Sequence, residues 1–127
     1  MLCLERKVNR LKLSKHFNSS EFACKCGCGF DSISRDLVEV LEDLRETYGF
    51  PVMINSGCRC LKHNKTVGGE PNSKHMEGIA ADIVVKGLSP AKVYQYLDSK
   101  YKDTFGIGLY KTWVHIDTRT RKTRWEK

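Results

Sequence analysis

Residues 73–85 read SKHMEGIAADIVV, and this stretch decides the fold because a polar loop runs straight into an apolar segment. The apolar part predicts a buried strand that contains Asp82, and His75 lies in the loop that enters it. The compact step GIAA between them lets the backbone pass close to a metal site. His115, in the later segment WVHID, is a third candidate ligand.

Two imidazoles and a carboxylate form a chemically coherent set. All three groups are ordinary zinc ligands, and three protein ligands plus a water make up a catalytic rather than a structural zinc site. Such an ion supplies hydroxide near neutral pH. A lone histidine near a strand is more often an ordinary polar residue, so the spacing alone leaves both interpretations open.

The segments around this stretch predict the remaining elements. An apolar stripe with helical spacing, Leu37, Val40, Leu41 and Leu44, follows Ser34, and Gly49-Phe50-Pro51 ends that helix. Ser89-Pro90 opens a second helix, with proline at its first position. Apolar runs predict strands at 52–54, 80–85, 105–110 and 113–118, the last two joined by a tight turn. Helices flanking a largely antiparallel sheet make an α+β domain.

Size and composition agree with one globular domain. The chain has 127 residues, of which 40% are hydrophobic and 29% charged. A chain of this length buries about two-thirds of its unfolded surface, so its core does not need disulfides. No apolar run reaches the ~20 residues that span a bilayer, which argues against membrane insertion. The start MLCLERKVNR lacks the apolar region of a secretory signal, so we expect synthesis in the cytoplasm.

The net charge of +7 favours an anionic partner such as nucleic acid, an anionic cell wall or a membrane surface. Much of this charge lies in residues 119–127, which we interpret as a basic tail following a core of 13–118. The tail holds five cations against Glu126: Arg119, Arg121, Lys122, Arg124 and Lys127. It is either a solvated tail or a strip that docks on a polyanion.

Several motifs together resemble a known family. The pattern Ser73-x-His75-x2-Gly78-x-Ala80-x-Asp82, with the later His115, is similar to that of the zinc D-Ala-D-Ala carboxypeptidases. These peptidoglycan D,D-peptidases share a fold with the Hedgehog signalling domain. Four further segments fit the resemblance: SGCRC-x3-N, Val67-Gly68-Gly69, FNSSEFACKCGCG and LRETYG. The last two, which are the N-terminal segment and the end of the first helix, resemble those of short, single-domain phage and bacterial members. The resemblance covers residues 13–118.

The resemblance implies roles for individual residues. His75, Asp82 and His115 would bind Zn²⁺. Arg59 matches the arginine that holds a substrate carboxylate or carbonyl, a role that suits a planar and permanently charged group; the alternative is a surface salt bridge. Ser73 would position the substrate or the loop of His75.

The general base is the point at which this chain departs from the family. Many relatives have Asp or Glu three residues before the last histidine, where this chain has Thr112. Asp117 is two residues beyond His115 and shares its face of the strand. It could accept the proton from water or hold His115 by a hydrogen bond. Glu77 is a second candidate for the base.

The resemblance therefore implies a zinc metallopeptidase that hydrolyses peptidoglycan stem peptides, as a carboxypeptidase or as an endopeptidase of the endolysin type. We expect a monomer that acts on the anionic cell wall after release, as phage enzymes do, and that binds no nucleic acid. One alternative is a non-catalytic, Hedgehog-like wall-binding module. Another is a basic, zinc-stapled nucleic-acid-binding protein, which lacks paired zinc-finger spacings and leaves SKHMEGIAAD unexplained.

The cysteines allow three states. Cys24, Cys26 and Cys28 alternate with other residues, and Cys58 and Cys60 flank Arg59. A structural zinc ion between the two clusters, a disulfide from Cys24 or Cys26 to Cys60, and free thiols are all compatible with this pattern. The C-x-C-x-C spacing is not that of a C-x2-C zinc knuckle. Cys58 stands where relatives often have an aromatic residue, which favours a packing role.

Overall fold

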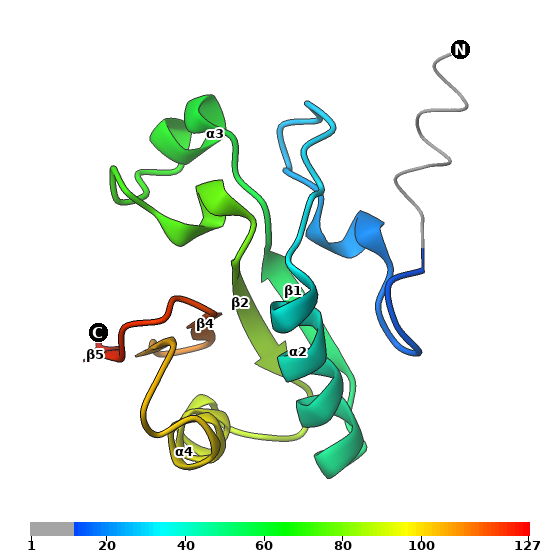
Figure 1. Cartoon of the computed structure of the whole chain (residues 1–127), viewed down its shortest axis with the longest axis vertical. Helices are drawn as coiled ribbons and strands as arrows, with labels where there is room; N and C mark the ends of the chain where they lie inside the picture. The colour runs from blue at the N-terminus through cyan, green and yellow to red at the C-terminus, as the bar shows by residue number, and fades with distance from the viewer. Residues whose placement is uncertain (1–11) are drawn as a thin grey trace.

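The computed structural model describes residues 12–127 and contains a single five-stranded sheet. The strands run in the order β1-β2-β4-β3-β5 (Figure 1). The pairs β1–β2, β2–β4 and β3–β4 are antiparallel and β3–β5 is parallel, so the expected α+β domain with a largely antiparallel sheet is confirmed. The bounds are β1 Val52–Ser56, β2 Ala80–Val85, β3 Gly106–Leu109, β4 Val114–Asp117 and β5 Thr123–Glu126.

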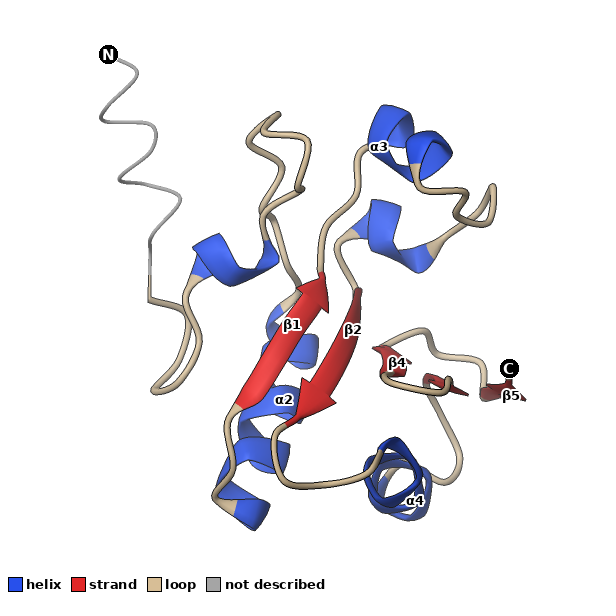
Figure 2. Ribbon diagram, turned by 180° about the vertical axis from the view of Figure 1, so that it is seen from behind, coloured by secondary structure: helices blue, strands red, loops and turns tan. Residues whose placement is uncertain are grey.

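Three α-helices and two 3-10 turns surround the sheet: α2 Arg35–Tyr48, α3 Leu61–Thr66, α4 Pro90–Lys100, η1 Ser19–Phe22 and η2 Lys74–Glu77. Helix α2 lies across the β1–β2 pair, and α3 and η2 lie beyond one end of it (Figure 2). Local signals set the helix ends. The Ser34 hydroxyl accepts a hydrogen bond from the Leu37 amide, and Gly49 ends α2 in the left-handed conformation that favours glycine.

The core lies between α2, α4 and the sheet, and Leu41 is fully buried within it. We expect Leu41→Ala to lower the free energy of unfolding by about 2–5 kcal/mol, because the lost methyl groups leave a cavity. Denaturant unfolding measures this change. Leu61→Ala is the matched control, since Leu61 is 60% exposed and its truncation should cost no more than about 0.5 kcal/mol. Equal losses in both variants would contradict this placement of the core.

The expectation of a basic tail at 119–127 is wrong for its second half. Residues 123–126 form β5, which pairs in parallel with β3. The guanidinium of Arg124 holds this strand in place. It donates to the carboxylate of Asp98 at 2.7 Å and to the backbone carbonyls of Tyr101, Thr104 and Phe105 at 2.7–3.1 Å. This cation therefore joins β5 to the end of α4 instead of facing solvent.

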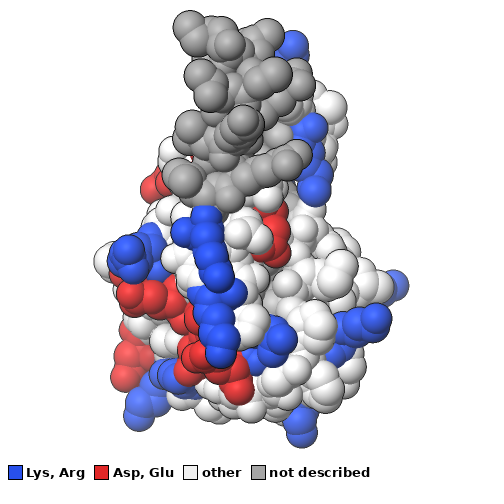
Figure 3. Space-filling view, turned by 90° about the vertical axis from the view of Figure 1, so that its right-hand side faces the viewer, with Lys and Arg blue, Asp and Glu red and all other residues white. Residues whose placement is uncertain are grey.

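Charge is mixed over the face that forms the right-hand side of Figure 1. Figure 3 shows Lys and Arg side chains interspersed with Asp and Glu there, so this face is not a surface of one sign. Among residues 12–127, no helix combines the length and apolar character needed to cross a membrane.

Candidate active site

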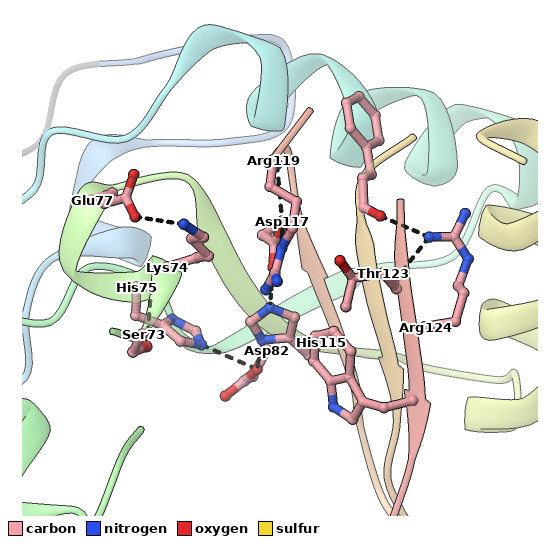
Figure 4. Close-up of polar contacts among 12 residues, drawn as sticks. Ser73, Lys74, His75, Glu77, Asp82, His115, Asp117, Arg119, Thr123 and Arg124 are labelled. Carbon is pink, nitrogen blue, oxygen red and sulfur yellow. Dashed lines mark hydrogen bonds and ion pairs between the residues drawn. The ribbon is translucent and has the colours of Figure 1, made fainter. Parts of the chain in front are cut away.

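Three side chains from three elements converge at one end of the β1–β2 pair. His75 comes from η2, Asp82 from β2 and His115 from β4, where β-sheet register places His115 directly opposite Asp82. The Asp82 Oδ1 atom lies 3.3 Å from His75 Nε2 and 3.0 Å from His115 Nδ1 (Figure 4). The three candidate ligand atoms lie within 4.8 Å of one another. The structure thus brings together the three residues that the sequence singled out.

Each imidazole is held by a second partner on its other nitrogen. His75 Nδ1 lies 2.7 Å from the carbonyl oxygen of Gly57, which can only accept a hydrogen bond. The proton of a neutral His75 is therefore on Nδ1, and the lone pair of Nε2 faces Asp82. His115 Nε2 lies 2.7 Å from the carboxylate of Asp117. Such contacts fix the tautomer and orientation of metal-binding histidines.

Asp117 is fully buried, and both of its oxygens are occupied. Arg119 donates to them through Nε and Nη2 at 2.8 and 2.7 Å, in addition to the contact with His115. Burial alone would raise the pKa of this carboxyl, but the hydrogen bonds from His115 and Arg119 outweigh it and hold the pKa well below its usual range. A weakly basic, fully bonded carboxylate is poorly suited to accept a proton, so its contacts favour the role of holding His115.

We expect Asp117→Asn to weaken zinc binding about 10–100-fold, because the amide removes the charge that orients His115. Competition with a chelator of known affinity measures the change. Asp98→Asn is the matched control, since it removes a carboxylate that pairs with an arginine on the far side of β5. Unchanged zinc affinity with greatly reduced turnover would instead identify Asp117 as the proton acceptor.

Arg59 is largely buried and faces the same cluster. Its Nη2 donates to Asp82 Oδ2 at 3.2 Å, while Nε donates to the Ser56 hydroxyl and Nη1 to the Asn64 side chain. Only 14% of its side chain is exposed, which excludes the alternative of a surface salt bridge. Backbone contacts support this placement, because the Arg59 amide donates to the carbonyl of His75.

A cleft of about 650 Å³ opens over this cluster. Its lining includes Arg59, the three converging residues and an aromatic wall made of Tyr110, Trp113 and Trp125. Tyr110 stacks on Trp113 with ring centroids 4.5 Å apart, and the Trp125 indole donates to the Tyr110 hydroxyl. The cleft therefore combines a polar floor with an apolar side, as sites for small ligands commonly do.

Trp125 is a cleft residue that sequence reasoning missed. Its ring lies 5.1 Å from that of His115 and packs against Gly108, where an added Cβ would be 2.3 Å from the indole. Glycine at this strand position thus leaves room for the tryptophan. The glycines within the apolar run 105–110 were the available signal, but the tryptophan that packs on Gly108 comes from β5 and can be identified only from tertiary pairing.

Ser73 and Glu77, the two remaining candidates from the sequence, lie next to the converging residues and are not among them. The Ser73 hydroxyl accepts a hydrogen bond from the His75 amide at 3.2 Å, which shapes the loop of His75. Glu77 forms an ion pair with Lys74 at 2.9 Å, is more than half exposed and does not line the cleft (Figure 4). Glu70 does line the cleft, although sequence reasoning did not select it.

Comparison with known proteins identifies a family for this chain. The family model described as Peptidase M15 matches residues 15–117. No curated protein matches the chain. The matched range includes every converging residue of the cleft floor and the aromatic residues Tyr110 and Trp113, but not β5.

Proposed function

The chain belongs to the peptidase M15 family, a family of zinc peptidases, and from that premise we propose that it hydrolyses the stem peptides of peptidoglycan. The observation that supports this most strongly is the convergence of His75, Asp82 and His115 at the floor of an open cleft. The proposed substrate is a peptide with a free carboxylate or a cross-link, and the proposed surroundings are an anionic cell wall reached after release from the producing cell.

The donor set fits zinc. Two imidazole nitrogens and one carboxylate oxygen are the ligands of many catalytic zinc sites, which leave a position open for water or substrate. We propose His75, Asp82 and His115 as the residues that hold the ion. When bound, zinc polarises a peptide carbonyl and lowers the pKa of water. Both imidazoles present an oriented nitrogen because Gly57 and Asp117 occupy the other one.

The other cleft residues suit the binding of a short anionic peptide. We propose that the Arg59 guanidinium pairs with a substrate carboxylate or with the oxygen on which negative charge develops, since its fork can donate two parallel hydrogen bonds. Lys74, Arg119 and Lys127 also line the cleft and favour a negatively charged ligand. The aromatic wall would pack against the apolar side chains of the peptide.

The proton acceptor is proposed to be an exposed carboxylate near the cleft, in place of Asp117. Glu70 lines the cleft, whereas Glu77 does not and its carboxylate is paired with Lys74, so Glu70 is the better placed of the two. The variants Glu70→Gln and Glu77→Gln separate these assignments. Loss of the acceptor lowers turnover while the zinc content stays the same.

The test of the function is digestion of purified peptidoglycan, followed by mass spectrometry of the released peptides. We expect the wild type to release either free D-alanine, which identifies a carboxypeptidase, or uncrosslinked stem peptides, which identify an endopeptidase. His115→Ala, which removes one proposed ligand, is the inactive control. A zinc-loaded wild type that binds the wall and releases nothing would instead indicate a non-catalytic wall-binding module.

A further inference from the structure

Four cysteine sulfurs gather at a second place, outside the cleft. Cys24, Cys26 and Cys28 come from the loop after η1, and Cys60 is the residue that caps α3. Their four Sγ atoms lie within 4.8 Å of one another. Cys26 and Cys60 are 34 residues apart in the chain, so the fold and not local spacing assembles the group.

The distances between the sulfurs fit a shared metal ion. Cys24 and Cys26 are 3.5 Å apart, and Cys26 and Cys60 are 3.6 Å apart. Four thiolates at a Zn–S distance of about 2.3 Å in a tetrahedron lie roughly 3.8 Å from one another. A disulfide requires about 2.05 Å, and all four cysteines are unpaired in the structure.

Two backbone amides donate hydrogen bonds to sulfurs of this group. The Cys60 amide donates to Cys24 Sγ, and the His63 amide donates to Cys60 Sγ, both at 3.4 Å. Hydrogen bonds of this kind orient ligands and stabilise negative sulfur. Gly27 and Gly29 adopt φ of 85° and 91°, which lets the loop fold its three cysteines to one side.

We propose that Cys24, Cys26, Cys28 and Cys60 bind a second zinc ion, which is structural. Thiolate is a preferred ligand of zinc, and four of them complete its coordination with no position left for water or substrate. Cys24 is buried, whereas Cys26 and Cys28 are exposed, so packing holds only the first of the three loop cysteines in the part of the chain that the structure describes. This inference does not depend on the proposed function.

The ion would join the loop of residues 24–28 to the segment that presents Arg59. Cys60 follows Arg59 directly, and the Cys58 amide on its other side donates to the carbonyl of Phe22 at 2.8 Å. One backbone hydrogen bond therefore already joins the start of this loop to the segment that carries Arg59. The second zinc ion would fix the same junction on the other side of Arg59.

The test is the zinc content per chain of protein purified under reducing conditions, measured by elemental analysis. We expect two zinc ions in the wild type, one in Cys26→Ser/Cys28→Ser and one in His75→Ala/Asp82→Ala. Cys58→Ala is the matched control and should keep two, since it removes a neighbouring cysteine that is not part of the four-sulfur group. The cysteine double variant should also melt at a lower temperature than this control.

Cobalt substitution identifies the ligands even if a variant folds poorly. Cobalt bound to thiolates gives an intense sulfur-to-metal charge-transfer absorption, which a histidine and carboxylate site does not give. We expect this band in the wild type and in His75→Ala/Asp82→Ala. Its absence from cobalt-loaded wild type, or a disulfide among the four cysteines in the reduced preparation, would overturn the proposal. A wild type with one zinc ion that only the His75→Ala/Asp82→Ala variant loses would overturn it too and leave the proposed function intact.

Discussion

Asp82→Ala is expected to lose one zinc ion per chain and to reduce peptide hydrolysis below detection. Its Oδ1 atom is the point to which both imidazoles are directed, at 3.3 and 3.0 Å. Burial alone would raise the pKa of this carboxyl, but its close contacts with the imidazoles of His115 and His75 outweigh burial and hold the pKa well below its usual range, so it is ionised at neutral pH. Removing it leaves two neutral ligands, which is too few for a catalytic zinc site. Elemental analysis and a peptide-release assay on the same preparation measure both effects.

The matched control for this loss is Asp98→Ala, which removes an ion-paired aspartate 2.7 Å from Arg124. It should keep its zinc and its activity, because Asp98 lies on α4 and does not line the cleft. Full activity of Asp82→Ala with unchanged zinc content would contradict the assigned ligand set. Residual zinc on the cysteines of that variant is expected and does not bear on this test.

Arg59→Ala is expected to lower kcat/KM about 10²–10³-fold while the zinc content is retained. A donor aimed at developing negative charge contributes an effect of this size in enzymes that use one. Arg59→Lys should recover only a small part of the loss. The guanidinium reaches Ser56, Asn64 and Asp82 at the same time, and a single ammonium group cannot replace that fork.

The substrate distinguishes a binding role of Arg59 from a purely structural one. If Arg59 pairs with a terminal carboxylate, the wild type should prefer a peptide acid to the corresponding peptide amide, and Arg59→Ala should lose that preference. Equal losses on both peptides, together with weaker zinc binding, would show that Arg59 acts by holding Asp82. Kinetic constants for the two peptides and chelator competition measure these outcomes.

The elements that the sequence predicted are those with strong local signals. Helix α2 has a serine cap, a continuous apolar stripe and a terminal glycine, and the structure uses all three. Strand β5 has none of these, because its four residues read TRWE and lie in a run of cations. Arg124 holds this strand by donating to carbonyls in the connection between α4 and β3, and no local pattern reveals that contact.

The candidate site also combines residues that the sequence predicted with residues that only the tertiary structure reveals. The resemblance supplied the three converging residues and Arg59, and the fold places all four together. The role of Asp117 could not be decided from its two-residue spacing to His115, since that spacing gives a shared face and not a contact. Arg119 occupies both carboxylate oxygens, and only tertiary structure shows it. Trp125 and the cysteine group likewise depend on segments far apart in the chain.

The position of β5 has a practical consequence for handling the protein. The strand supplies one side of the cleft, and Lys127, whose amide donates to the Leu109 carbonyl at 2.8 Å, is part of the cleft lining. Any peptide fused after Lys127 would start at the mouth of the cleft. An oligohistidine purification tag there would bring competing imidazoles within reach of the proposed metal site, so metal contents and rates measured with such a fusion would include a contribution from the tag.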